Sequence, residues 1–221
     1  MYEKYFTETN NLRRIANNNF KLGDELGEDG ELLYDIADKW AIINLEKETG
    51  SNIYTVLEYL EIKQIIKKIA KKINDSKIDN FIFLPILNGS VPFLRLLVQN
   101  IEKKYKIHYI KYKTYQNNYI KQTQKIDLSQ FPNVKNKNII ILDDILETGE
   151  TLGTVKKELK KLGAKTIQTC VLLKRKYKTN GDVDYCGKII EDNSFLVGFG
   201  LDYNNRYRNI NKIVAIDKVL M

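Results

Sequence analysis

The chain has few cysteines and no long hydrophobic run. Only two of its 221 residues are cysteines, and Cys170 lies within an apolar segment, which favours reduced thiols over a disulfide or metal site. A membrane-spanning helix needs about 20 consecutive apolar residues, whereas runs such as residues 81–87 have the length of strands. The first residues lack the apolar core of a secretory signal. These absences predict a cytoplasmic protein without a membrane span.

The excess of positive charge is concentrated on two predicted helices. The chain has 36 Lys and Arg against 28 Asp and Glu, a formal net charge of +8, and a basic balance is also found in nucleic-acid-binding proteins. Residues 62–73 repeat isoleucine with helical spacing and place lysines between the isoleucines, and residues 155–162 follow the same logic. Such lysines cover the solvated faces of packed helices, so nucleic acid is not the expected partner.

The chain from about residue 59 onward alternates apolar strands with amphipathic helices. We expect strands near 81–87, 107–112, 139–142 and 167–173, and helices near 59–74, after residue 90 and from 151 to Gly163. This alternation indicates a doubly wound α/β fold, with a mostly parallel sheet and helices on both faces. Residues 59–221 are therefore the expected core. Residues 1–58 are the expected N-terminal segment, with helical fragments separated by Gly23, Gly27, Gly30 and Gly50.

Residues 139–152 combine an apolar strand, two acids and a loop that opens a helix. Asp143 and Asp144 leave the strand, and Thr148, Gly149 and Thr151 lie at the helix start. The N-terminus of a helix suits a phosphate, whereas carboxylates suit a sugar diol or a divalent cation. Together these groups predict a site for a ribose phosphate. The alternative is an acidic strand end followed by an ordinary N-cap at Thr148.

Two further segments are candidates because ligands of an open parallel sheet gather at the carboxyl ends of its strands. Asn88 and Gly89 form a turn directly after the strand at 81–87. Residues 195–208 read Phe-Leu-Val-Gly-Phe-Gly-Leu-Asp-Tyr-Asn-Asn-Arg-Tyr-Arg. The turn alone is a weak signal, and the second segment is also compatible with core aromatics and a surface ion pair. A Rossmann dehydrogenase is excluded, because no Gly-x-Gly-x-x-Gly turn occurs in the sequence.

In combination, the three segments resemble the type I phosphoribosyltransferases, and residues 195–208 resemble the hypoxanthine-guanine members. The resemblance spans about residues 60–217. It implies the fold of that family with a small hood formed by the N- and C-terminal segments. It also implies a Mg²⁺-dependent enzyme of purine salvage, which transfers phosphoribosyl from phosphoribosyl pyrophosphate to a purine base and releases a purine nucleoside monophosphate. A homodimer or homotetramer is the implied assembly.

The resemblance also implies a role for each candidate residue. Glu147 stands where the family has its catalytic base, normally an aspartate, which is one methylene shorter. The ribose and phosphate set is Asp143, Asp144, Thr148, Gly149, Glu150 and Thr151; the pyrophosphate set is Asn88, Gly89 and Arg208; the purine set is Lys174, Arg175, Phe195, Leu196 and Asp202; the Mg²⁺ ligands are Asp143, Asp144 and Asp202; and Thr114 and Tyr115 belong to a lid. For the lysine that contacts the purine, residue identity favours Lys174 and ungapped counting favours Arg175.

A second class of function stays open at this point. This alternative is a regulator that has the phosphoribosyltransferase fold, binds nucleotides or RNA, and has weak or no catalysis. Glu147 in place of aspartate and the unusual lid favour it. The retained acids, threonines, Asp202 and Arg208 favour the enzyme. The sequence does not distinguish hypoxanthine, guanine and xanthine as the preferred base.

Overall fold

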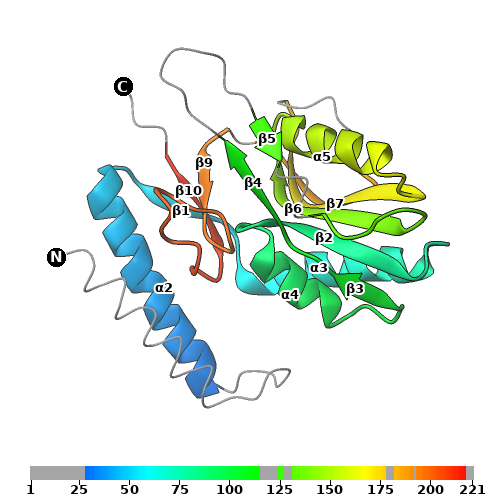
Figure 1. Cartoon of the computed structure of the whole chain (residues 1–221). Coiled ribbons are helices and arrows are strands. Elements are labelled where there is room, and N and C mark those ends of the chain that lie inside the picture. The colour runs from blue at the N-terminus through cyan, green and yellow to red at the C-terminus, as the bar shows by residue number, and fades with distance from the viewer. Residues whose placement is uncertain (1–27, 115–123, 127–130, 178–181, 192, 218–221) are drawn as a thin grey trace, which may run out of the picture. The chain divides into compact units, whose positions relative to one another are not determined.

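A computed structural model of the protein describes residues 28–114, 124–126, 131–177, 182–191 and 193–217 (Figure 1). Its elements in chain order are α2 (Glu28–Thr49), β1 (Ile53–Leu57), α3 (Tyr59–Asp75), β2 (Phe81–Leu87), α4 (Val91–Val98), β3 (Tyr105–Ile107), β4 (Ile110–Thr114), β5 (Gln124–Ile126), β6 (Asn138–Leu146), α5 (Glu150–Lys161), β7 (Thr166–Arg175), β8 (Tyr185–Ile190), β9 (Phe195–Val197) and β10 (Ile213–Ile216). They form two compact units. The core unit is Gln64–Asp192, and the hood unit joins the residues up to Lys63 with those from Asn193.

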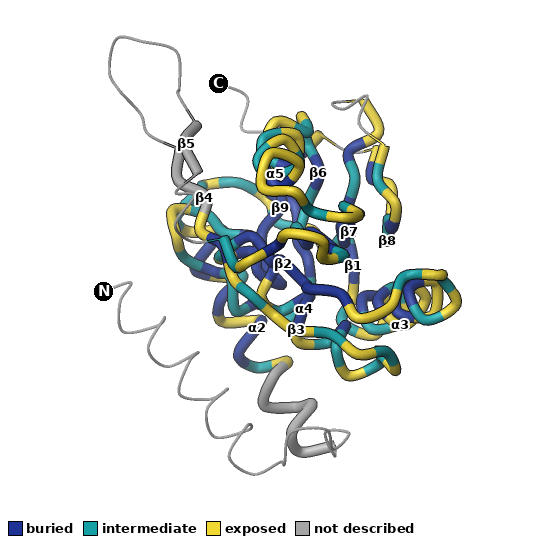
Figure 2. Tube along the Cα trace, turned by 45° about the vertical axis from the view of Figure 1, so that its right-hand side comes forward, coloured by how far each residue is buried: buried dark blue, intermediate teal, exposed yellow. Residues whose placement is uncertain are grey.

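The core unit is built on a mostly parallel sheet. Its strand order is β5-β4-β2-β6-β7-β8, and β3 also pairs with β2. Every pairing is parallel except that of β4 with β5. Strand β2 is buried except at its last residue, and β6 and β7 are each buried along a central stretch, residues 139–142 and 169–173, as the dark blue segments of Figure 2 show. Apolar side chains on both faces of a strand are expected where helices cover both faces of the sheet.

Helices cover the two faces of this sheet, with α5 on one side and α3 and α4 on the other (Figure 1). The face below α5 is one apolar cluster that includes Ile82, Leu84, Ile139, Ile141 and Val171 from the strands and Leu152, Val155 and Leu159 from the helix. On the other face, a Cβ atom at Gly187 of β8 would lie 2.7 Å from Ile65 of α3, which leaves room only for glycine. The predicted doubly wound α/β fold is confirmed.

The hood unit is a three-stranded antiparallel sheet packed against α2. The strand order is β1-β10-β9, so the first strand of the chain pairs with the last. Ala41 and Leu45 of α2 pack against Val197, Val214 and Ile216 of the sheet in a second apolar cluster. The contacts that build this unit therefore join segments far apart in the sequence.

The structure departs from the sequence-based expectation in three places. Helix α2 is continuous over Glu28–Thr49. Gly30 does not interrupt it, because this residue lies in the first turn, where the backbone N–H groups make no hydrogen bond within the helix. Gly50 does end the helix, with φ of 65°. The expected strand at 107–112 is divided into β3, which pairs with the start of β2, and β4, which pairs with its end. Strand β6 continues past the acids to Leu146.

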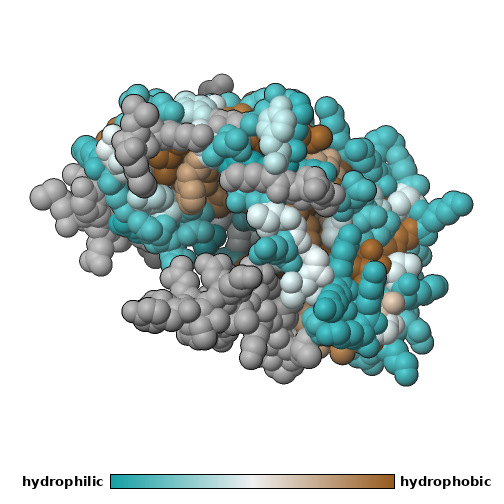
Figure 3. Space-filling view, turned by 90° about the horizontal axis from the view of Figure 1, so that it is seen from above, coloured by the Kyte–Doolittle hydropathy of each residue, from teal (hydrophilic) through white to brown (hydrophobic). Residues whose placement is uncertain are grey.

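The lysines of α3 and α5 lie where the periodicity predicted. Ile62, Ile66, Ile69 and Ile73 are buried, and the lysines between them are exposed or partly exposed. Among the coloured residues on the face seen in Figure 3, hydrophilic side chains cover more of the surface than hydrophobic ones. Among the helices that the structure describes, none is long and apolar enough to cross a membrane.

Candidate active site

Strand β6 carries the paired acids beyond the edge of its neighbour β2. The pairing of β2 with β6 ends at Pro85 and Leu142, whereas β7 continues to pair with β6 through Leu146. Asp143 and Asp144 therefore follow the last residue of β6 that β2 covers. This is the carboxyl end of a central parallel strand, where open α/β sheets bind their ligands.

The two carboxyl groups are held close to the backbone and to each other. The Oδ1 atom of Asp143 accepts a hydrogen bond from the N–H of Asp144 at 3.1 Å, and the Oδ1 atom of Asp144 accepts one from the N–H of Ile145 at 2.8 Å. Burial of its carboxyl group, followed by the charge of Asp144, raises the pKa of Asp143 well above its ordinary value. A cation or a hydrogen-bond donor at this place would relieve the repulsion.

The turn after β2 meets the acids directly. A Cβ atom placed on Gly89 would lie 1.6 Å from the Oδ2 atom of Asp144 and 2.6 Å from its Cγ atom. Gly89 is therefore required by contact, and the predicted pyrophosphate turn and the predicted ribose acids occupy one place. The preceding peptide bond, Leu87–Asn88, is cis, and Asn88 is exposed whereas Gly89 is buried.

The loop between β6 and α5 has the geometry of a helix start. Gly149 is the N-cap residue with φ of 86°, a backbone conformation that glycine adopts without strain. Thr148 accepts a hydrogen bond from the N–H of Glu150 through its Oγ1 atom at 3.4 Å. Thr151 lies in the first helical turn and is partly exposed. The first turn of α5 and these two threonines thus lie where a phosphate site was predicted.

Glu147 and Arg175 form an ion pair at the ends of β6 and β7. The Arg175 Nε atom lies 3.3 Å from the Glu147 Oε1 atom, and the exposed fractions of the two side chains are 3% and 43%. Successive residues of a strand point to opposite faces, so Lys174 and Arg175 leave β7 in different directions. Of the two candidates for the purine-contacting cation, the structure places Arg175 next to Glu147.

The hood unit contains the predicted residues Phe195, Leu196, Asp202 and Arg208. Phe195 is 56% exposed, whereas Leu196 is buried, and the ring of Tyr203 meets that of Phe195 edge to face with centroids 6.0 Å apart. Arg208 pairs with Asp202, with Nη2 and Oδ1 2.7 Å apart. Thr114 ends β4, and Tyr115 lies outside the described residues.

The sequence analysis missed two acids of α2. Asp38 is 2% exposed, and both of its carboxylate oxygens lie within hydrogen-bonding distance of the N–H of Asn211, at 3.1 and 3.2 Å. Glu48 contacts Arg206 and Tyr207. Both acids lie at helical spacing from the buried residues Ala41 and Leu45, and an acid on an apolar stripe is the signal that points to a buried partner.

Residues 55–204 match the protein family described as the phosphoribosyl transferase domain. The chain belongs to this phosphoribosyltransferase family. The hypoxanthine-guanine phosphoribosyltransferase of Lactococcus lactis is 32% identical over 170 residues, which cover 76% of this chain and 91% of the relative. The hypoxanthine phosphoribosyltransferase of Buchnera aphidicola is 30% identical over 152 residues, covering 67% and 85%. The sequence resemblance to hypoxanthine-guanine phosphoribosyltransferases is confirmed.

Solved structures of this phosphoribosyltransferase family share the fold. A hypoxanthine-guanine phosphoribosyltransferase from Bacillus anthracis, with a HEPES molecule in its active site, has a TM-score of 0.64 and 26% identity, and the match covers 74% of this chain and 98% of that one. A hypoxanthine phosphoribosyltransferase from Staphylococcus aureus has a TM-score of 0.66 and 27% identity, covering 74% and 91%. The whole of α2, Glu28–Thr49, lies outside the matched family region, which begins at residue 55.

Proposed function

We propose that this phosphoribosyltransferase transfers the phosphoribosyl group from phosphoribosyl pyrophosphate to hypoxanthine or guanine, giving IMP or GMP and pyrophosphate in purine salvage. The observation that carries the proposal is the contact between Gly89 and Asp144 in a chain of this family. It unites a turn suited to pyrophosphate with acids suited to ribose, just before the helix start suited to phosphate.

The ribose 5-phosphate is proposed to bind at the start of α5. Gly149 brings the backbone close to the ligand, while the N–H groups that follow it and the hydroxyl groups of Thr148 and Thr151 donate to phosphate oxygens. Glu150 is proposed to contribute its backbone N–H, which would exchange its 3.4 Å hydrogen bond to the Thr148 Oγ1 atom for one to a phosphate oxygen. Asp143 and Asp144 would accept hydrogen bonds from the ribose hydroxyl groups.

Magnesium fits the acids at the end of β6. Carboxylate oxygens are its preferred protein ligands. Burial of the carboxyl group and then the charge of Asp144 raise the pKa of Asp143, and a divalent cation would offset both effects. Among the described residues no cluster of three metal-binding side chains exists, which suits an ion that keeps water and substrate oxygens in its coordination shell. Asp202 is the proposed ligand of an ion on the pyrophosphate, and Asp143 and Asp144 are the proposed ligands of a second ion at the ribose. The bound ion would supply positive charge to the departing pyrophosphate.

In the proposed reaction, the bond between the anomeric carbon and pyrophosphate breaks and the purine nitrogen forms a new bond to that carbon. Glu147 takes the proton that the nitrogen loses. Arg208 and the backbone N–H groups of Asn88 and Gly89 hold the pyrophosphate oxygens as their charge increases. Arg175 is the proposed contact to the exocyclic oxygen of the purine.

The purine is proposed to stack on Phe195, whose exposed ring is supported at its edge by Tyr203. Leu196 lies in β9, an edge strand among the described strands of its sheet, and the outward backbone groups of an edge strand remain open to a ligand. Asp202 completes this set. Thr114 and Tyr115 are proposed to belong to a lid that excludes water from the positively charged sugar. We also propose a cytoplasmic homodimer or homotetramer.

An assay with radiolabelled bases tests this function. Hypoxanthine, guanine and xanthine are each incubated with phosphoribosyl pyrophosphate and Mg²⁺, and nucleotide and pyrophosphate are quantified. We expect IMP or GMP to form, with one pyrophosphate released per nucleotide, and no product when Mg²⁺ is chelated. Absence of product with all three bases, together with salt-sensitive retention on heparin, would instead support the RNA-binding regulator.

A further inference from the structure

The loop that carries Asp202 and Arg208 has an unfavourable backbone. This loop, residues 198–211 between β9 and β10, is termed the hood loop. Its residues with φ in the left-handed region are Gly198, Phe199, Gly200, Asn204, Asn205 and Tyr207, with φ of 97°, 48°, 102°, 50°, 60° and 66°. Four of the six carry a Cβ atom, which makes this conformation costly. Such a loop keeps its shape only where surrounding contacts determine it, and such sites cluster at ligand-binding segments.

Hydrogen bonds inside the hood loop link the two residues proposed to hold magnesium and pyrophosphate. The Asp202 carboxylate accepts from the N–H of Asn205 at 2.8 Å and pairs with Arg208. Arg208 also donates through Nη1 to the carbonyl of Gly200 at 2.7 Å. The N–H of Gly200 donates to the Arg208 carbonyl, and that of Arg206 to the Tyr203 carbonyl, both at 2.9 Å.

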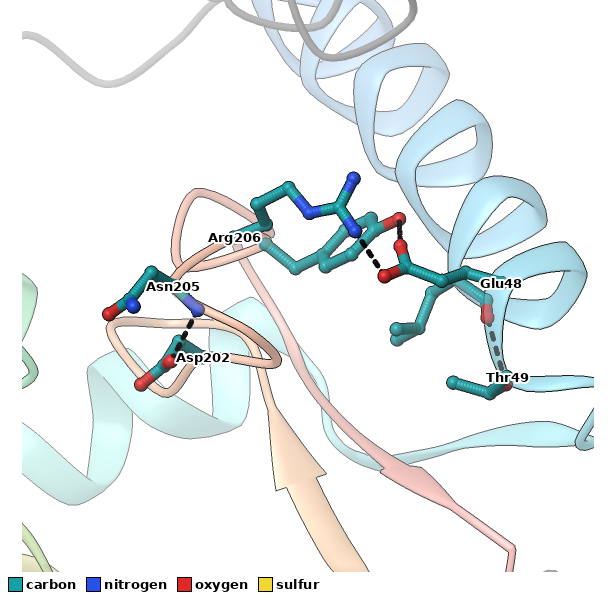
Figure 4. A network of polar contacts seen from close by, with 7 residues as sticks. Glu48, Thr49, Asp202, Asn205 and Arg206 are labelled. Carbon is teal, nitrogen blue, oxygen red and sulfur yellow. Dashed lines mark hydrogen bonds and ion pairs between the residues drawn. The ribbon is translucent and has the colours of Figure 1, made fainter. Parts of the chain in front are cut away.

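Helix α2 holds this loop from outside through Glu48. One carboxylate oxygen of Glu48 accepts from the Tyr207 hydroxyl at 2.6 Å, and the other accepts from the Nη2 atom of Arg206 (Figure 4). Tyr207 is buried, with 6% of its surface exposed, and the Glu48 side chain is only 15% exposed. At the far end of the loop, Asp38 of α2 faces the N–H of Asn211. Hydrogen bonds to an ionised carboxylate are stronger where the carboxylate is partly buried than where water surrounds it, which applies to the two bonds of Glu48.

We propose that Glu48 is a positioning residue for the pyrophosphate site. Arg206 and Tyr207 lie directly before Arg208, so the two contacts of Glu48 fix the backbone from which the Arg208 side chain leaves. The two contacts of Glu48 thereby hold the Asp202–Arg208 ion pair in place before substrate arrives. Substrate binding then does not have to supply the free energy of ordering the hood loop. The inference rests on the proposed function, because the pyrophosphate site that Glu48 would support is part of that function.

Substitution of Glu48 tests the inference. Glu48→Gln keeps the shape of the side chain and removes its charge. We expect the KM for phosphoribosyl pyrophosphate to increase about tenfold, because substrate then binds only the fraction of molecules with an ordered loop, while kcat changes little at saturation. Hydrogen exchange at the amides of residues 198–211 should accelerate by a similar factor in the absence of any substrate.

Two further variants separate positioning from general stability. Leu45→Val weakens the apolar cluster between α2 and the hood sheet, to which Tyr207 also belongs, and removes no polar atom of Glu48, Arg206 or Tyr207. We expect it to lower the Tm without the increase in KM. Tyr207→Phe removes only one of the two contacts and should reproduce part of the effect, and its effect should be smaller in the Glu48→Gln background.

An equal increase in KM for Glu48→Gln and Leu45→Val at the same loss of Tm would overturn the inference and leave only a stabilising role. Wild-type exchange rates over residues 198–211 in Glu48→Gln would also overturn it, whether or not the enzyme is active. Failure of the proposed function has a different signature, because wild-type protein would then form no nucleotide while the exchange measurement still responds to Glu48.

Discussion

The Glu147–Arg175 pair is the contact whose removal tests the catalytic assignment most directly. Glu147 has one methylene more than the aspartate usual in the family, and it meets a guanidinium group whose side chain is 3% exposed. A buried arginine stays charged, so it holds the Glu147 carboxylate in the position that the proposed function assigns to the catalytic base. We expect Glu147→Gln to lower kcat by about 100-fold or more, the usual contribution of a general base.

The strength of the pair follows from its geometry. Two unit charges separated by the observed 3.3 Å interact by ~5 kcal/mol at an effective dielectric constant of ~20. Because 43% of the Glu147 side chain is exposed, solvent screening reduces this value to about 1–2 kcal/mol. In kcat/KM, such an energy corresponds to a factor of about 5–30.

A double-mutant cycle measures this coupling. Glu147→Gln, Arg175→Met and the double variant are compared with wild type in steady-state assays with each purine base, and thermal denaturation checks that all four proteins fold. We expect Arg175→Met to cost about 5–30-fold less in kcat/KM when Glu147 is already replaced. Lys174→Met is the matched control, and it should show no coupling to Glu147. Turnover unchanged by Glu147→Gln with every base, or additive effects of the two substitutions, would refute the reasoning.

Three other substitutions test the site. Gly89→Ala places a Cβ atom 1.6 Å from the Asp144 Oδ2 atom. It should lower kcat/KM by about 100-fold or more, because a misplaced catalytic-site group costs that much. The control variant is Gly153→Ala, which has no atom within 4 Å of its Cβ and should raise stability by about 0.5–1 kcal/mol in denaturant titrations. Asp143→Asn should stabilise the Mg²⁺-free protein increasingly as pH rises above about 4. The pKa of Asp143 is raised in the folded state, so the unfolded wild-type chain releases this proton first and the wild type loses folding stability with increasing pH. Unfolding curves of the two proteins between pH 4 and 8 with no growing difference would contradict this. Phe195→Ala should raise the KM for the purine base by about 5–10-fold, from about 1–1.5 kcal/mol of lost stacking, and leave the KM for phosphoribosyl pyrophosphate near its wild-type value.

Local patterns were sufficient to predict most of the core unit. The apolar run at 81–87 and the isoleucine spacing of 62–73 each describe one element whose burial is set by its own sequence. The segment that was expected to be one strand is divided into β3 and β4. The division lies at His108, whose backbone N–H donates to the Phe83 carbonyl of β2. The acids of β6 were found because their strand is unambiguous.

The hood unit was beyond such patterns. Its sheet forms only when β1 meets β10, and the pairing of two short strands from remote segments is not encoded in either one. Glu48 is unremarkable in sequence and acquires a role only through Arg206 and Tyr207. Likewise, residue identity favoured Lys174 and ungapped counting favoured Arg175, and the sequence left the choice open because the alternation of β7 decides which side chain meets Glu147.

The discontinuity of the hood unit also determines the order in which the protein can be built during translation. The core unit is one uninterrupted stretch, Gln64–Asp192, so the part with Asp143, Asp144 and Glu147 is able to fold while Asp202 and Arg208 have yet to be synthesised. Strand β1 waits longest, because Ile53 pairs with Ile216. Until β10 leaves the ribosome, β1 is an open edge that can pair with another chain. Newly made protein is therefore exposed to misassembly through β1, at a time when the strand that carries Asp143 and Asp144 is already able to fold.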